Sequence, residues 1–321
     1  MSKYHLGIDV AKDKFDVALL IEEKFKTKTF NNTTKDFTAL LEWLNKHNCS
    51  YPELHCCMEA TGVYGHELAT FLIENRLKVS MVNPARIKSF GKSEMLRTKT
   101  DKSDSKLIAR FCQAMNPALW APAPEHIQLL QGLVRRLDSL IAIKLQEENR
   151  LAVTNEISIQ ESINSVIKVV EEQILEVKNK INNCIGNNDD LNKKRELLAT
   201  IPGVGEATIN TVLAFLVGYE QFDSAKQMAA FIGLTPRHHE SGKSVKGRTR
   251  ISKVGDAQVR KSLYFPAIVA KKHNPIIKAF CEKLEKNGKT KMEIICAAMR
   301  KLIHIIFGVI KNKKSFDPKM A

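Results

Sequence analysis

The chain has 321 residues, 44% of them hydrophobic and 26% charged, which excludes a disordered or fibrous protein and indicates two domains. Lysine and arginine number 50 against 35 aspartates and glutamates. The resulting formal net charge of +15 predicts a polyanionic partner, either nucleic acid or an acidic membrane surface. From residue 200 onward 22 basic side chains accompany 9 acidic ones, so we expect the last third of the chain to bind the polyanion.

Residues 4–20 predict a β-hairpin, because apolar side chains alternate with Gly7 and Asp9 and alternate again after a charged turn at 11–14. Residues 24–30 continue the alternation as a third strand. Asp9 therefore projects from the middle of a sheet. An acid inside a strand is unfavourable by propensity and by desolvation, so Asp9 either faces solvent at an edge or is held by positive charge.

Helices and strands then alternate up to residue 82. Residues 31–34 supply N-cap candidates for a helix, and residues 54–60 read as a buried strand that contains Glu59 near its end. A second helix follows through Arg76, and residues 78–82 form a fifth strand. Together these elements predict a mixed α/β sheet.

Two further acids, Asp101 and Asp104, lie three residues apart at the start of a predicted helix, so both carboxylates point from one face of its first turn. Acids at a helix N-terminus also cap the helix and compensate its dipole, which would explain either residue without a ligand. Two acids on one face, after a basic segment with Arg97 and Lys99, favour a site for a hard divalent cation beside a phosphate.

In their order and secondary-structure context, Asp9, Glu59, Asp101 and Asp104 resemble the D-E-D-D constellation of RuvC-like nucleases with the RNase H fold. This resemblance implies that the four acids are metal ligands for a pair of Mg²⁺ ions that flank the scissile phosphate. Two metals about 3.5 to 4 Å apart can stabilise both the attacking and the leaving oxygen.

Residues 121–190 predict a helical arm. Apolar residues recur every three or four positions, with charges between them and no glycine or proline from Leu133 to Ile185. The pattern predicts two long amphipathic helices in an antiparallel coiled coil, and a plain helical bundle within one subunit explains it equally well. The predicted core positions are Leu130, Leu133, Leu137, Leu140, Ile141, Ile163, Val166, Ile167, Val170, Ile174, Val177 and Ile181.

Residues 191–321 predict a mostly helical domain with a loose tail from residue 311. The run IPGVG at 201–205 lies between two helical patterns and resembles a helix-hairpin-helix turn. In such a turn the glycines, here Gly203 and Gly205, let backbone N–H groups approach a phosphate. A tight turn between helices without a ligand would have the same sequence.

Residues 231–264 include the most basic stretch, in which eight lysines and arginines accompany two acids between positions 237 and 261. Its glycines and serines predict an exposed, flexible loop. A solvated loop that only binds phosphates would explain this charge, but it would not require Ser241, which could be a simple turn residue.

Taken in order, the motifs resemble the DEDD transposases of insertion-sequence family one-hundred-ten, which are DNA recombinases guided by a bridge RNA. The resemblance covers nearly the whole chain. It rests on GIDVAK around Asp9, MEATGVY around Glu59, VNP at 82–84, RTKTDKSD at 97–104, the helical arm, IPGVG, and GLTPRHHESGKSVKG leading to SKVGDAQVRKSLY.

This family resemblance implies a RuvC-like DEDD domain over residues 1–120, a coiled-coil arm over 121–190 and a C-terminal transposase domain over 191–321. It implies that the four acids bind Mg²⁺ and that Ser241 attacks DNA to form a covalent phosphoserine link. It also implies a dimer of dimers in which one subunit's acids meet another's serine, and a noncoding bridge RNA that pairs with both target and donor DNA.

The residues expected to contact nucleic acid are the basic and glycine residues of these motifs. They are Arg97, Lys99, Gly203, Gly205, Arg237, Lys243, Lys246, Arg248, Arg250, Lys253, Arg260 and Lys261. His238 and His239 lie close to Ser241 in sequence, but such neighbouring histidines are more often phosphate or solvent contacts. The group that deprotonates Ser241 therefore stays open.

Two other functions fit the same residues. In one, the chain is a RuvC-like, metal-dependent endonuclease that selects branched DNA and hydrolyses it through the acids, with a basic domain that only binds. In the other, it is a nucleic-acid-binding protein without activity, and the acid cluster is vestigial.

The remaining sequence signals concern the compartment. The seven cysteines include no C-x-x-C pair and are odd in number, which indicates neither a disulfide framework nor a zinc site. No signal peptide opens the sequence, and the apolar runs are shorter than the roughly 20 residues that span a bilayer. We expect a prokaryotic cytoplasmic protein without a membrane partner, associated with the nucleoid when active.

Overall fold

The computed structural model describes residues 3–60, 64–94, 101–217, 222–237, 240–241, 245–246 and 250–320, without the side chains of residues 101, 102, 240, 241, 245, 246 and 320. The predicted contacts Arg97, Lys99, Lys243 and Arg248 lie outside this part, as do His238 and His239. The chain divides into two compact units, Met1–Pro122 and Ala123–Ala321. The further division of the second unit into an arm and a C-terminal domain stays a prediction.

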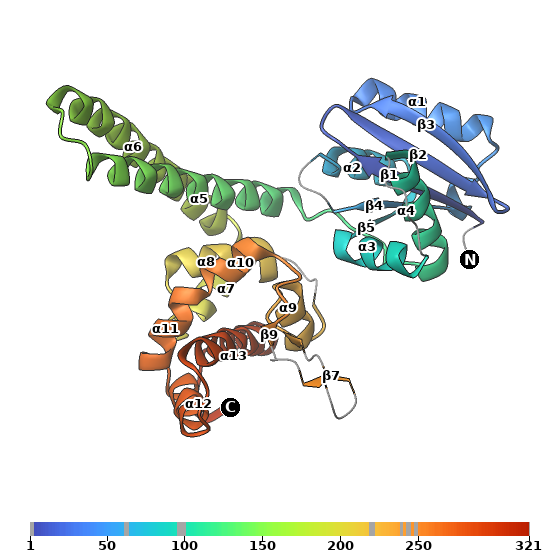
Figure 1. Cartoon of the computed structure of the whole chain (residues 1–321). Helices are drawn as coiled ribbons and strands as arrows, with labels where there is room; N and C mark the ends of the chain where they lie inside the picture. The colour runs from blue at the N-terminus through green and yellow to red at the C-terminus, as the bar shows by residue number, and fades with distance from the viewer. Residues whose placement is uncertain are drawn as a thin grey trace. The chain divides into compact units, whose positions relative to one another are not determined.

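The first unit is built on a five-stranded sheet with the strand order β3-β2-β1-β4-β5 (Figure 1). The three N-terminal strands form an antiparallel meander, and β4 and β5 continue the sheet in parallel with β1. The strands are β1 (Tyr4–Val10), β2 (Lys14–Ile21), β3 (Lys24–Asn31), β4 (Leu54–Glu59) and β5 (Lys78–Val82). The predicted mixed α/β sheet is confirmed, and every predicted strand is present within two residues.

Helices cover both faces of this sheet. Side chains from α1 (Thr34–Lys46) and α2 (His66–Glu74) pack with alternate strand residues on one face. On the other face α3 (Pro84–Ser93) and α4 (Asp101–Met115) enclose a smaller cluster. The sequence did not predict α3, which begins where the Asn83 side chain accepts a hydrogen bond from the Ala85 amide at 2.8 Å. A 3₁₀ turn, Tyr51–Glu53, precedes β4.

The second unit opens with two long helices, α5 (Glu125–Leu151) and α6 (Ile157–Gly186), which pack against each other as a hairpin (Figure 1). Most of the predicted core positions are buried or partly buried. Ile141 and Val166 are not, with 48% and 43% of their surface exposed. Their spacing suits the contact face, but both side chains lie on the flank of the hairpin, where they stay in solvent.

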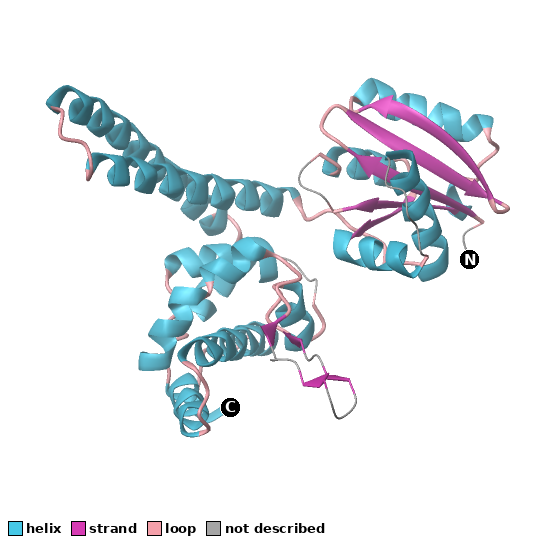
Figure 2. Cartoon of the chain, in the orientation of Figure 1, coloured by secondary structure: helices cyan, strands magenta, loops and turns pink. Residues whose placement is uncertain are grey.

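The rest of the second unit is mostly helical, as Figure 2 shows, and this mostly helical remainder was predicted. Its elements are α7 (Asp189–Ala199), α8 (Glu206–Val212), a π-helical turn at Leu213–Val217, α9 (Ala225–Phe231), α10 (Ala257–Ser262), α11 (Tyr264–His273), α12 (Pro275–Lys286), α13 (Lys291–Asn312) and a 3₁₀ turn at Pro318–Met320. Within the described part of the chain, no helix is long and apolar enough to cross a bilayer.

Two segments differ from their predictions. The basic stretch, expected to be a flexible loop, contains four two-residue strands: β6 (Pro236–Arg237), β7 (Glu240–Ser241), β8 (Val245–Lys246) and β9 (Arg250–Ile251). The tail, expected to be loose, is held at Phe316, whose amide donates to the Thr200 hydroxyl at 2.9 Å and whose ring packs on the core. Both segments gain backbone hydrogen bonds that a local pattern does not reveal.

Candidate active site

Asp9 and Glu59 lie at the carboxyl ends of the parallel neighbours β1 and β4. The register pairs Ile8 with Met58, so the next position along each strand is an acid. Parallel strands end at the same edge of a sheet, and adjacent strands are about 4.8 Å apart. The two carboxylates, 50 residues apart in the sequence, therefore leave the sheet at the same place.

Both acids project from the face that α4 covers. Ile8 packs in the cluster beneath α1 and α2, whereas Cys57 packs in the cluster beneath α3 and α4. Side chains alternate between the two faces of a strand. Glu59 lies two residues after Cys57 and therefore points to the same face, the one that α4 covers. Asp9 lies two residues after Gly7, which contacts α4, so Asp9 points to this face as well.

Helix α4 rests directly on β1 at Gly7. A Cβ atom at Gly7 would lie 2.0 Å from the carbonyl oxygen of Ser105 and 2.3 Å from the amide nitrogen of Ala109. Since both neighbours are backbone atoms, no side-chain rotation could relieve the overlap. Glycine is thus required at this position by the close approach of the helix.

We expect Gly7→Ala to lower the free energy of unfolding by about 3 kcal/mol, because α4 would have to move off the sheet. Urea denaturation of the full chain measures this loss. Gly132→Ala is the matched control, since a Cβ there meets nothing within 4 Å and glycine in α5 costs roughly 0.5 to 1 kcal/mol relative to alanine. Equal unfolding midpoints for Gly7→Ala and the parent protein would refute the close packing.

The direction of α4 places its first turn toward the acids. Near the C-terminal end of α4, the Cys112 sulfur lies 3.5 Å from the carbonyl oxygen of His55, which is paired with His5 at the start of β1. Farther toward the helix N-terminus, Ser105 lies over Gly7. Helix α4 therefore runs antiparallel to β1, and its first turn lies over the strand end that carries Asp9.

Asp101 and Asp104 belong to that first turn. Asp101 begins α4, and the side chain of Asp104 is partly buried. The structure thus brings the backbone positions of all four predicted acids to one edge of the sheet. Among the residues whose side chains are described, however, no three His, Cys, Asp or Glu side chains lie close enough to hold a metal ion together. The side chain of Asp101 is not among those described, so it does not belong to this group.

Asp16 is a fifth acid at this edge, and the sequence analysis did not single it out. It is the direct cross-strand partner of Asp9, and only 5% of its surface is exposed. The Thr29 hydroxyl donates a hydrogen bond to Asp16 Oδ1 at 2.5 Å, and the Lys14 amine lies 3.5 Å from Oδ2. Asp16 lies beside Asp9 because of the register in which β1 and β2 pair. The sequence of the turn at residues 11–14 does not determine that register.

The chemistry of the donors suits a hard cation. Carboxylate oxygens are the ligands that Mg²⁺ prefers. A hydrogen bond with Cys57, together with burial, raises the pKa of Cys112, whose thiol lies near the C-terminal end of α4, away from the acids. A thiol that stays protonated is a poor metal ligand.

Ser241 lies in the second unit, on a short hairpin. In the two ladders Ser241 pairs with Val245, and Arg237 pairs with Arg250. Arg237 and Arg250 are both exposed, and like charges directly opposite each other on a sheet are destabilising. An anion between the two guanidinium groups would remove this repulsion, so the foot of the hairpin is suited to bind phosphate.

The other predicted contacts with nucleic acid differ in how exposed they are. Lys253 and Lys261 are exposed and can reach a partner. Arg260 is partly buried, and its Nη1 donates to the carbonyl oxygen of Ile232 at 2.8 Å and to that of Lys253 at 3.4 Å. Lys246 has its backbone in β8. Arg260 therefore has a structural role in addition to any contact with nucleic acid.

The IPGVG turn connects α7 and α8. Gly203 has a φ of 98°, and a Cβ there would lie 2.7 Å from the Ala270 side chain, so this glycine serves packing against α11. Gly205 is exposed and open, directly before α8. The turn is explained by its helix contacts alone, and phosphate binding by either glycine stays a prediction.

Comparison with known proteins identifies the family. Residues 6–154 match the model of DEDD-type IS110 transposases, and residues 195–282 match the model of the transposase IS116/IS110/IS902 family. The pilin gene-inverting proteins of Moraxella lacunata and Moraxella bovis are each 35% identical over 321 residues, which is 100% of this chain and 99% of the relative.

A more distant relative covers most of the chain as well. The transposase for insertion sequence element IS1111A of Coxiella burnetii is 24% identical over 300 residues, or 84% of this chain and 78% of that protein. The mixed sheet of the first unit and the mostly helical remainder fit a DEDD-type transposase. The chain belongs to the IS116/IS110/IS902 family of transposases and is a DNA transposase or recombinase.

Proposed function

We propose that the chain is a site-specific recombinase of an insertion sequence that cuts and rejoins target and donor DNA under the guidance of a noncoding bridge RNA. The observation that carries this proposal is the meeting of Asp9 and Glu59 on one sheet face, with the first turn of α4 over them. Such an edge concentrates negative charge that a bound divalent cation would offset.

The four acids would hold two Mg²⁺ ions, which supply Lewis-acid stabilisation of charge on the phosphate oxygens when bound. Asp9 and Glu59 would contribute oxygens from the sheet, and Asp101 and Asp104 from the helix. Asp16 already accepts a hydrogen bond from Thr29 and lies beside Lys14, so it would not be one of the metal ligands.

Ser241 would be the nucleophile. Its Oγ forms a bond to phosphorus while the P–O3′ bond breaks, the serine gives up its proton, and the departing 3′ oxygen takes one up to become a hydroxyl. The phosphoserine bond conserves the energy of the phosphodiester, so the reverse reaction rejoins strands without ATP. Arg237, Lys246 and Arg250, with Arg248, would offset charge on the pentacoordinate phosphate.

The helical arm would form a coiled coil that joins subunits into dimers, and two dimers into a tetramer. Ile163, Val170 and Val177 are buried at intervals of seven residues, which is the heptad period of a coiled coil. Large apolar side chains such as Val169 and Leu175 are more than half exposed on the arm, and an assembly would cover them. Its site of action would be the cytoplasm, on the nucleoid.

The pilin gene-inverting relatives, as their name says, invert a gene, which is a reaction of cutting and rejoining. This likeness supports recombination over plain hydrolysis. A RuvC-like endonuclease remains the second candidate, because the acids alone suffice for attack by water. A role in binding alone is contradicted by the membership in a transposase family.

Sequencing the RNA that co-purifies with the protein tests the guide. We expect one noncoding transcript, encoded beside the gene for this chain, to be enriched over total RNA. An unrelated protein of similar net charge, purified in the same way, shows the background that electrostatics alone produces. Enrichment no greater than this background would refute RNA guidance while leaving the DNA chemistry untouched.

A further inference from the structure

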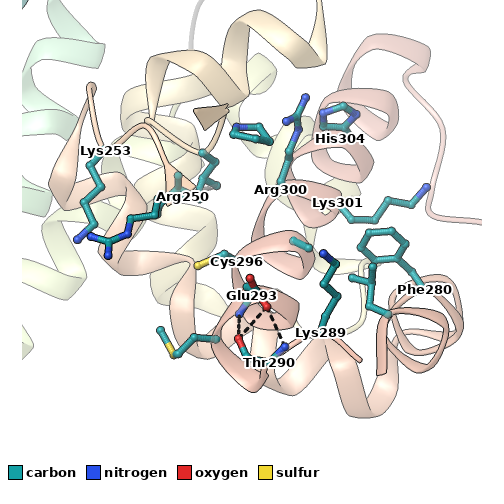
Figure 3. A pocket seen from close by; sticks show the side chains of 16 residues that line it. Arg250, Lys253, Phe280, Lys289, Thr290, Glu293, Cys296, Arg300, Lys301 and His304 are labelled. Carbon is teal, nitrogen blue, oxygen red and sulfur yellow. Dashed lines mark hydrogen bonds between the residues drawn. The ribbon is translucent and has the colours of Figure 1, made fainter. Parts of the chain in front are cut away.

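A cavity of about 710 Å³ lies at the foot of the Ser241 hairpin. Pro236, Arg250 and Ile251, from the paired strands β6 and β9, form one side, and α12 and the N-terminal half of α13 form the rest. Figure 3 shows Arg250 and Lys253 on one side of the cavity and Phe280 on the other. This volume lies in the range of small-molecule sites and exceeds what a bound water or single ion needs.

The lining combines apolar walls with a cationic rim. Leu234, Ile251, Phe280 and Leu284 present carbon surface, and Phe280 supplies an aromatic face. Basic side chains surround them: Arg250, Lys253, Lys289, Arg300 and Lys301. A flat apolar group that carries negative charge would satisfy both features, and an unstacked base with its phosphate is such a group.

The cationic charge of the rim is only partly neutralised by the described lining residues. Among the described lining residues the carboxylate is Glu293, and it closes the capping box of α13. Its Oε2 accepts hydrogen bonds from the Thr290 amide and hydroxyl, each at 2.9 Å. The basic side chains therefore have to find their counter-charge in a ligand or in solvent.

His304 lines the cavity and carries a buried polar atom. Its Nε2 is buried and has no hydrogen-bond partner among the described residues. Burial, with Arg300, Lys301 and Lys226 nearby, lowers the pKa of His304, so the ring is neutral at pH 7. A neutral ring nitrogen can donate to, or accept from, the edge of a base.

Lys253, which lines the same cavity, has a strained backbone conformation. Lys253 has a φ of 56°, and its amide donates to the Gly233 carbonyl at 3.1 Å. Arg260 holds the Lys253 carbonyl from the other side. A non-glycine residue in this conformation costs about 1 to 3 kcal/mol, and such strain clusters at functional sites.

We infer that this cavity binds one unstacked nucleotide of the nucleic acid strand that the Ser241 hairpin engages, with the base against Phe280 and the phosphate on the cationic rim. The inference rests on the proposed function, because it assumes that a nucleic acid strand is bound close to the proposed nucleophile, Ser241. DNA and RNA nucleotides share this chemistry, and the experiment separates them.

Binding of fluorescein-labelled single-stranded DNA and RNA 12-mers to the full chain, measured by anisotropy, tests the inference. Phe280→Leu keeps apolar volume but removes the stacking face, so we expect about tenfold weaker binding. Phe265→Leu is the matched control, since Phe265 is 74% exposed on α11 and does not line the cavity. Arg300→Gln should reduce the slope of log affinity against log salt concentration by about one. Lys278→Gln, whose side chain does not line the cavity, should change this slope less.

A 5-iodouracil placed in the strand and irradiated reports which nucleic acid enters the cavity. We expect a crosslink at Phe280 from either the DNA or the guide RNA, and whichever strand crosslinks is the occupant. Equal affinities for Phe280→Leu and Phe265→Leu would overturn the inference. A peptide of a second chain crosslinked at Lys289 in place of nucleic acid would overturn it as well.

The binding measurement uses Ser241→Ala protein, which lacks the proposed nucleophile. If the cavity assignment fails, Phe280→Leu with an intact serine still forms covalent DNA adducts at the parent level. If the proposed function fails, nucleotide binding at Phe280 persists but no adduct forms with any variant. The two failures therefore give different results.

Discussion

Ser241→Ala should abolish covalent protein–DNA adducts, with recombination falling by at least a thousandfold. The variant lacks the hydroxyl oxygen that we propose forms the bond to phosphorus, and Val245, the cross-strand partner of Ser241, is not a nucleophile. Adducts are measured as protein that stays bound to labelled DNA in denaturing gels. Folding and RNA binding should stay unchanged, because Ser241 belongs to a two-residue strand and not to one of the helices that form the core.

Ser244→Ala is the control for this substitution, since it removes a hydroxyl from the same basic stretch. It should retain adduct formation. Recombination by Ser241→Ala at the parent rate would show that the serine assignment is wrong. Free 5′-phosphate ends without attached protein, formed equally by both variants, would instead identify the chain as a RuvC-like endonuclease that uses water.

Asp9→Asn should reduce strand cleavage by about a thousandfold, because a neutral amide removes one charge from the cation site and several kcal/mol of transition-state stabilisation. It should also weaken the binding of Mn²⁺, which electron paramagnetic resonance detects without any DNA. The thermal midpoint should stay the same or rise, since the substitution relieves repulsion between Asp9 and the buried Asp16 beside it.

Asp13→Asn is the matched control, because Asp13 is exposed in the turn that joins β1 to β2. It should bind Mn²⁺ and cleave DNA as the parent does. Unchanged Mn²⁺ binding by Asp9→Asn would remove Asp9 from the proposed ligand set. Loss of cleavage with retained Mn²⁺ binding would assign Asp9 a role in positioning DNA.

The secondary structure could be predicted where the pattern is local. The strand at 78–82 and the long helices of the arm follow from alternation and from three- and four-residue spacing, which reflect side-chain direction. Helix α3 was missed because Asn83-Pro84 reads equally well as a turn or as a helix start. The strands of the serine hairpin are too short for any period to appear.

The sequence alone supplied the residue types on which the proposed chemistry rests: four acids in order, a serine in a basic stretch and a net charge that predicts a polyanionic partner. Residue types and their spacing carry this information, because charge and hydrogen-bonding capacity belong to each side chain. The family comparison shows the class of enzyme, a DNA transposase or recombinase.

Only the tertiary structure decided which residues meet. The contact of α4 with Gly7, the pairing of Asp16 with Asp9 and the cavity between α13 and the serine hairpin join segments far apart in the chain or depend on strand register. A one-residue change of register would turn every side chain of a strand to the other face, and no local pattern excludes it. The packing of whole elements against one another settles the register, and with it the place where the acids gather.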